Sequence, residues 1–358
     1  MRYSASKLSK IFSASENLLS AEEILEAVKN NGLPMPPAGS KSWTVDQVPR
    51  LGEKLGYLHR PLRPQVFCFF VTKGGVLKSS LTLNFARILA LHNIKTCVVG
   101  LDMQGDITTS LGYDLNLESD LDLEEALQRI GSVRGLPDLF YGNVELNEIV
   151  LPTELPSLYF IPETPELVSL ERNLTYRNRR EFWLKDFVVD PLKEQFDVIL
   201  LDGPPNWNQL ITNALVSCDH LISPLECKIN NFRNFKMFET FIKDFQRDLK
   251  LQLNHMFIPT RLNPNRKLSR EINDWYHDNL TGCVVGAIRE STQGEEATAM
   301  HLSVAEYAPS SQAALEMKDI VAQVWKSAEA TINGLDKTLQ SHSHPSQQEQ
   351  TNTIEGGL

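Results

Sequence analysis

The chain has 358 residues, of which 42% are hydrophobic and 22% charged, and its formal net charge is −10. This length suits one large or two ordinary globular domains. No apolar run approaches the roughly 20 residues that span a bilayer, and the N-terminus lacks the apolar core of a secretion signal, so we expect a cytoplasmic protein without membrane contact. The negative charge argues against a chain that coats nucleic acid by bulk electrostatics, so DNA contact would require a local basic patch.

Residues 1–63 are predicted to form a small helical module. A Pro- and Gly-rich stretch at 33–39 separates a helical pattern over 20–32 from a second one over 41–61. This region carries nine Lys or Arg against six Asp or Glu. Short helices with basic flanks fit a helix-turn-helix, and its candidate DNA-binding residues are Lys41, Arg50 and Lys54. Pro49 is expected to break the clearest recognition helix, so an accessory helical cap remains the alternative.

Residues 64–330 are predicted to form one doubly wound α/β domain with a mostly parallel sheet. Short, continuous apolar runs alternate with longer helical patterns, as expected for strands covered by helices on both faces; these runs lie at 66–71, 96–101, 158–162, 197–202, 220–225, 255–259 and 283–288. A final amphipathic helix is expected before residue 330. Residues 331–358 are polar with few apolar anchors, and we expect them to form a disordered tail.

The stretch KGGVLKSS, residues 73–80, has the character of a phosphate-binding loop. Glycines let successive backbone N–H groups converge on an anion, and the helix that follows directs its positive end at the charge. The common pattern G-x-x-x-x-G-K-[ST] would place Gly at position 77, where this chain has Leu77. The pattern K-G-G-x-x-K-[ST] is complete, and it begins with a second lysine, Lys73.

This loop resembles the signature of the deviant Walker ATPases, and within them the ParA family that segregates plasmids and chromosomes. The resemblance implies that Lys73 reaches across a homodimer interface to the partner's ATP and acts in catalysis with Lys78. It also implies a site for ATP and Mg²⁺ in which Ser79 contacts the metal; the cofactor-binding residues would be Lys73, Gly74, Gly75, Val76, Leu77, Lys78, Ser79 and Ser80.

Two further segments resemble the same family. In VVGLDMQGD, Asp102 corresponds to the carboxylate that orients or activates the attacking water, whereas Gly100 and Met103 replace an acidic residue and a proline of the family pattern. In FDVILLDGPP, Asp202 ends an apolar strand, where it would hold the metal's water shell. Because all three segments follow apolar strands in the family's order, together they are a specific signal.

The C-terminal part of the domain supplies the remaining candidates. By resemblance, either Asn263 or Pro264 would face the adenine base. A basic surface for sequence-independent DNA binding would contain Arg261, Arg266, Lys267, Arg270 and Arg289. A solvated helix face would explain several of these residues equally well.

The resulting interpretation is a DNA-partition ATPase associated with the nucleoid. It would dimerise with ATP, bind DNA non-specifically, respond to a ParB-like partner and repress its own operator. The alternative is a nucleotide-sensing transcription regulator with little or no hydrolysis. The departures from the family pattern at Gly100 and Met103 favour this alternative. A membrane-bound division regulator is disfavoured because residues 341–358 contain no Lys or Arg. An iron–sulfur reductase relative is disfavoured because the cysteines are scattered.

Overall fold

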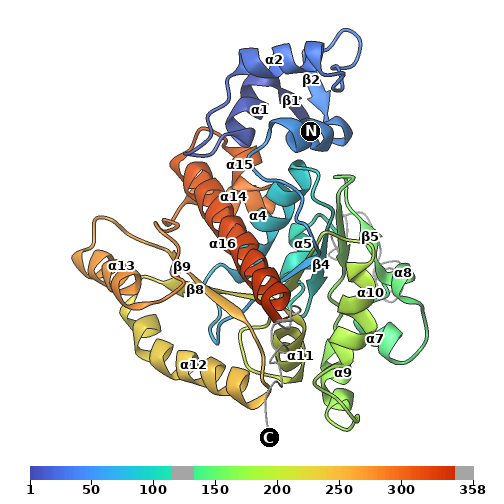
Figure 1. Cartoon of the computed structure of the whole chain (residues 1–358), viewed down its shortest axis with the longest axis vertical. Helices are drawn as coiled ribbons and strands as arrows, with labels where there is room; N and C mark the ends of the chain where they lie inside the picture. The colour runs from blue at the N-terminus through green and yellow to red at the C-terminus, as the bar shows by residue number, and fades with distance from the viewer. Residues whose placement is uncertain (114–132, 343–358) are drawn as a thin grey trace, which may run out of the picture.

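The computed structural model describes residues 1–113 and 133–342. Its centre is a seven-stranded sheet in the order β5-β6-β4-β7-β3-β8-β9 (Figure 1). Only the β5 edge strand runs antiparallel to its neighbour. The strands are β3 Gln65–Phe69, β4 Thr96–Gly100, β5 Leu151–Pro152, β6 Leu158–Ile161, β7 Val198–Asp202, β8 His220–Glu226 and β9 Asn254–Thr260. This confirms the doubly wound, mostly parallel sheet predicted from the apolar runs.

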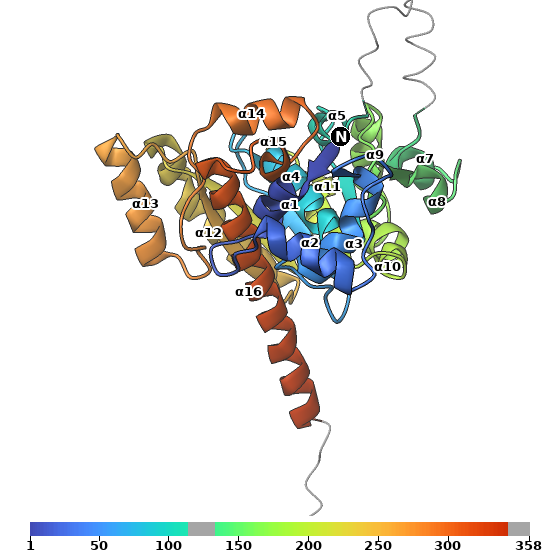
Figure 2. The same ribbon diagram turned by 90° about the horizontal axis from the view of Figure 1, so that it is seen from above.

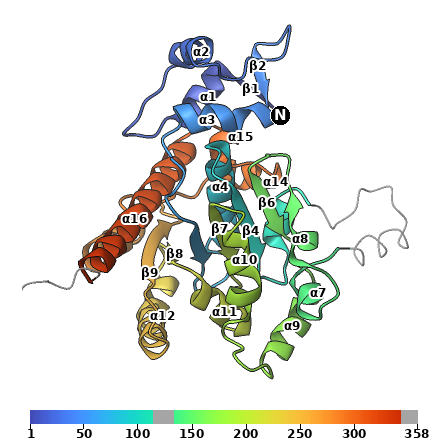
Figure 3. The same ribbon diagram turned by 45° about the vertical axis from the view of Figure 1, so that its right-hand side comes forward.

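Helices cover both faces of the sheet (Figure 3). One face packs against α4 Lys78–Leu91, α14 Thr292–Ala299, α15 Val304–Tyr307 and α16 Gln312–His342. The other face packs against α7 Leu136–Phe140, α8 Leu146–Ile149, α9 Leu167–Leu174, the π-helix Lys185–Val189, α10 Asp190–Lys193, α11 Gln209–Ser217, α12 Ile229–Asp248 and α13 Lys267–Asn279. The short α5, Asp106–Ser110, follows β4. Along β3, Phe67 and Phe69 point into one core, while Val66 and Cys68 point into the other.

The expected strand over 283–288 is wrong. Cys283 and Arg289 make only isolated bridges to neighbouring segments. Gly282 and Gly286 adopt φ values of 86° and 94°, which interrupt an extended backbone. An apolar run alone therefore did not distinguish a strand from a buried, turning segment.

Residues 1–63 fold into a small α/β unit that shares a hydrophobic core with the larger α/β domain. Its elements are β1 Arg2–Ser4, α1 Ala5–Phe12, α2 Ala21–Asn30, β2 Ser42–Thr44, the 3₁₀ helix Val45–Gln47 and α3 Val48–Leu55. Pro49 lies in the first turn of α3, where a proline is tolerated, so the expectation that it breaks this helix is wrong. Gly52 brings α3 against α4 so closely that a Cβ there would lie 1.9 Å from the Leu91 carbonyl oxygen.

A buried ionic cluster fixes this unit to the domain. Arg87 on α4 and Glu306 on α15 form an ion pair of 2.6 Å, and the Tyr3 hydroxyl donates to Glu306 at 2.7 Å. Arg87 and Glu306 are 1% and 0% exposed, so neither charge has water as an alternative partner. Through Tyr3, the unit is therefore joined to a buried ion pair of the α/β domain.

The last helix is longer than expected. α16 continues to His342, beyond the predicted start of the tail at residue 331, and projects from the body of the molecule (Figure 2). Residues 343–358 of the expected tail lie outside the described part of the chain. No helix among the described residues is long and apolar enough to cross a membrane.

Candidate functional site

The phosphate-binding loop connects β3 to α4 at the carboxyl edge of the sheet. Gly75 and Leu77 adopt left-handed backbone conformations with φ of 73° each. Leu77 is the N-cap of α4 and makes no side-chain cap, so the first N–H groups of the helix are available to an anion. A leucine in this conformation is strained by about 1–2 kcal/mol relative to glycine, which gives the physical reason that the common pattern has Gly here.

Lys78 folds back into the loop. Its Nζ donates to the Lys73 carbonyl oxygen at 2.9 Å, and the side chain is buried. Burial lowers the pKa of Lys78, and Asp202, Asp102 and Asp106 oppose that effect. The ammonium group thus lies inside the loop, where a phosphate could replace the carbonyl as its partner.

Asp202 and two hydroxyl groups form an oxygen-rich cluster beneath the loop. Ser79 Oγ donates to Asp202 Oδ2 at 2.7 Å, and Thr82 Oγ1 donates to Oδ1 at 2.5 Å. Burial raises the pKa of Asp202 to about 6, against the lowering effect of these hydrogen bonds and of Lys78. Hydroxyl and carboxylate oxygens suit Mg²⁺. Thr82 was not predicted, although its position one helical turn after Ser79 could have indicated it.

Asp102 follows β4 and lies beside this cluster. Its Oδ1 accepts from the backbone N–H of Gln104 at 3.1 Å, and the residue is buried. Burial raises the pKa of Asp102, and the hydrogen bond from Gln104 opposes the rise. The carboxylate thus lies largely shielded from water, among other charged groups, at the same sheet edge as the phosphate loop.

Lys73 is tied to its own subunit by an ion pair. Its Nζ lies 3.2 Å from Glu226 Oε2 at the end of β8, and the same carboxylate contacts Lys228 at 3.2 Å and Arg261 at 3.4 Å. Burial alone would raise the pKa of Glu226, but hydrogen bonds from Lys228 and Lys73 hold it below its ordinary value. No sequence signal pointed to Glu226.

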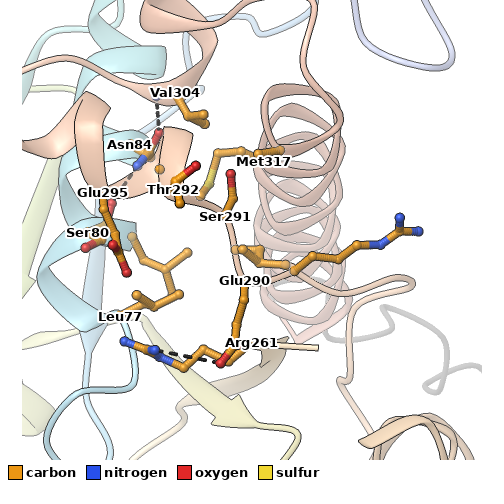
Figure 4. A pocket seen from close by; sticks show the side chains of 15 residues that line it. Leu77, Ser80, Asn84, Arg261, Glu290, Ser291, Thr292, Glu295, Val304 and Met317 are labelled. Carbon is orange, nitrogen blue, oxygen red and sulfur yellow. Dashed lines mark hydrogen bonds and ion pairs between the residues drawn. The ribbon is translucent and has the colours of Figure 1, made fainter. Parts of the chain in front are cut away.

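A cavity of about 370 Å³ opens next to the start of α4 (Figure 4). It is lined by α4, by the segment 288–292, by α16 and by Arg261, whose side chain points toward Glu290. Neither Asn263 nor Pro264 lines this cavity, and the Asn263 side chain instead accepts from the Asn265 N–H. A nucleoside in this cavity would contact Arg261 and the segment 288–292 together with α4 and α16.

The predicted basic residues divide into two groups. Arg261 pairs with Glu226, and Arg289, although exposed, pairs with Glu316 at 3.0 Å, so both make ion pairs within the fold. The others are exposed: Arg266, Lys267 and Arg270 at the start of α13, and Lys41, Arg50 and Lys54 on the N-terminal unit. The exposed side of α2 is acidic, with Glu22, Glu23 and Glu26.

The parallel sheet, the phosphate loop ahead of α4 and the convergent carboxylates define a P-loop nucleotide hydrolase. A family model described as an AAA domain matches residues 64–255. The cell division protein PomZ of Myxococcus xanthus is 27% identical over 78% of this chain and 81% of its own length. The chromosome partitioning protein ParA of that organism is 30% identical over 46% of this chain and 53% of its own length.

A solved structure agrees with the fold. The putative plasmid partition protein of Borrelia burgdorferi bound to AMPPNP superposes with a TM-score of 0.59, at 20% identity, over 74% of this chain and all of that one. The chain belongs to the AAA domain family, and within it to the ParA-type partition ATPases, which are ATP-hydrolysing enzymes. The resemblance predicted from the three motifs is thereby confirmed at the level of the family.

Proposed function

We propose that this protein is an ATP- and Mg²⁺-dependent switch for DNA segregation that dimerises with ATP, binds DNA and releases it on hydrolysis. The observation that carries the proposal is the convergence of Lys73, Lys78, Ser79, Asp102 and Asp202 at one edge of the sheet. These residues come from three separate segments of the chain. Phosphate binding, metal binding and the orientation of water could therefore all take place at this one site.

Each residue has a role that its geometry supports. Lys78 would exchange the Lys73 carbonyl for phosphate oxygens, and the free N–H groups of the loop would bind the same anion. Ser79 and Asp202 would hold Mg²⁺, which supplies charge neutralisation at the phosphates when bound. Asp102 would orient the attacking water, a function that contributes about 10²- to 10⁴-fold to rate.

Lys73 would act between two subunits. In the single chain its ammonium group contacts Glu226, so reaching a partner's nucleotide requires that this ion pair break. The Lys73 side chain is 36% exposed, which leaves the group accessible from outside. Dimerisation would therefore compete directly with the contact to Glu226.

DNA would contact the exposed basic residues. Arg266, Lys267 and Arg270 form a cluster at the start of α13 that suits sequence-independent binding to phosphates. Operator binding would use Lys41, Arg50 and Lys54 of the N-terminal unit, since the acidic α2 would repel DNA. A ParB-like partner that stimulates hydrolysis, and association with the nucleoid, complete the proposal.

Binding to random-sequence duplex DNA with ATP, with ADP and without nucleotide, over a salt series, tests the proposal. We expect ATP alone to give tight, salt-sensitive binding, Lys73→Ala to abolish it, and Lys193→Ala on α10 to leave it unchanged. Binding that ignores nucleotide, or that survives Lys73→Ala, would overturn the switch.

A further inference from the structure

At the end of β4, the Glu163 side chain fills the space that a side chain at position 100 would need. β4 and β6 are parallel neighbours, with Val99 opposite Ile161, so the residues that follow them meet at the carboxyl edge. A Cβ placed on Gly100 would lie 2.2 Å from Glu163 Cγ and 2.6 Å from its Cδ. Gly100 does not have a positive φ, so the backbone does not require glycine there. The glycine is needed because the Glu163 side chain fills the position.

The Glu163 carboxylate binds both ends of the loop that carries Asp102. Oε1 accepts from the Asp102 N–H at 3.2 Å. Oε2 accepts from the N–H groups of Ile107 and Thr108 at 3.2 and 3.3 Å, and from the Thr108 hydroxyl at 3.2 Å. The residue is 1% exposed, so none of these donors is exchanged for water. The carboxylate therefore fixes the path of residues 102–108.

The position of the Glu163 side chain beside Gly100 also indicates which group its carboxylate replaces. The segments that VVGLDMQGD resembles carry an acidic residue where this chain has Gly100. An aspartate at position 100 would project its carboxyl group from a Cβ already 2.9 Å from Glu163 Oε1. Its carboxyl group would therefore lie close to the place that the Glu163 carboxylate occupies. In this chain, the carboxylate at this place comes from the connection between β6 and α9.

We propose that Glu163 is a positioning residue for ATP hydrolysis, which replaces the absent acid at position 100 and holds Asp102 in its working geometry. This inference rests on the proposed role of Asp102. The Glu163 carboxylate accepts its hydrogen bonds from the Asp102–Thr108 loop, so its effect on the reaction passes through the placement of Asp102. A displacement of about 1 Å at such a group can cost about 10²-fold in rate.

Four variants test the inference by their kcat and KM for ATP: Glu163→Gln, Glu163→Ala, the double variant Gly100→Asp/Glu163→Ala, and the control Glu166→Gln. Glu166 is an exposed residue of the same connection. We expect Glu163→Gln to lower kcat by about 10²-fold at unchanged KM, because one acceptor oxygen becomes an N–H donor that faces N–H groups. Glu166→Gln should behave as the wild type.

The double variant separates positioning from a merely structural role. If Gly100→Asp restores most of the kcat lost in Glu163→Ala, the carboxylate at this place is what hydrolysis requires. If Glu163→Gln retains wild-type kcat, or if the double variant folds but recovers nothing, the inference is overturned. Should Glu163→Ala not fold, Glu163→Gln decides alone.

Asp102→Ala distinguishes the two proposals. If turnover is unchanged in Asp102→Ala, the proposed site fails. If Asp102→Ala loses turnover and Glu163→Gln does not, only the role of Glu163 fails.

Discussion

Replacing Leu77 by glycine and by alanine measures the strain stored in the phosphate loop. Leu77 has φ 73° and ψ 26°, a left-handed conformation in which Cβ crowds the following carbonyl oxygen. Both replacements remove the leucine side chain, which packs partly against the core and lines the cavity beside α4. The comparison of Gly with Ala therefore isolates the conformational term.

Two opposing effects set the expected difference. Relief of the left-handed strain favours Gly over Ala by about 1–2 kcal/mol. The greater freedom of glycine in the unfolded chain favours Ala by about 0.4–1 kcal/mol. We therefore expect Leu77→Gly to be more stable than Leu77→Ala by about 1 kcal/mol.

Urea titration at constant m-value is the suitable assay, because in a chain of 358 residues this difference moves Tm by only about 1–2 °C. The matched control is the pair Leu25→Gly and Leu25→Ala at an exposed position inside α2, where Ala should be the more stable by about 1 kcal/mol. If Leu77→Ala equals or exceeds Leu77→Gly, Leu77 is not strained and the explanation of the departure at this position is wrong.

Two further predictions concern charged contacts. Glu226→Gln should release Lys73 in both subunits and raise the association constant of the ATP-dependent dimer by about 30-fold, as expected from two ion pairs worth about 1 kcal/mol each. Sedimentation at several protein concentrations measures this constant, and an unchanged value would contradict the prediction. Glu306→Gln should cost about 3 kcal/mol of unfolding free energy at neutral pH, the low end for a broken buried ion pair, because the buried charge of Arg87 keeps only the half-exposed Glu154 as a partner among the ion pairs of the described residues. Burial alone would raise the pKa of Glu306, but Arg87 and its other partners lower it to about 2. The contribution of Glu306 to the free energy of unfolding is therefore present above the ordinary pKa of 4.5 and is lost as the pH falls toward 2. In urea titrations at several pH values, the wild type should lose this stability between pH 4.5 and 2, and Glu306→Gln should not.

The fold could be predicted because most strands of the sheet coincide with short apolar runs in the sequence. Continuous apolar runs such as 66–71 and 197–202 are needed wherever both faces of a strand are buried, and six of the seven predicted runs lie in the observed sheet. The run at 283–288 failed because glycines turn the backbone there, and burial without pairing leaves the same apolar signature. The β5 edge strand was missed because two residues carry no periodicity.

The sequence by itself indicated the phosphate loop, Asp102 and Asp202 as candidate site residues, because they follow strands whose carboxyl ends must meet at one edge of a parallel sheet. The resemblance of these segments also indicated the family. Only the tertiary structure decided which partners they find. Glu163 lies 61 residues from Asp102 and Glu226 lies 153 residues from Lys73 in the chain, and no local pattern links such pairs. Tertiary packing also joined Tyr3 to Glu306 and made the N-terminal unit part of the ATPase core. These contacts depend on burial and direction, which arise only when the layers of the fold come together.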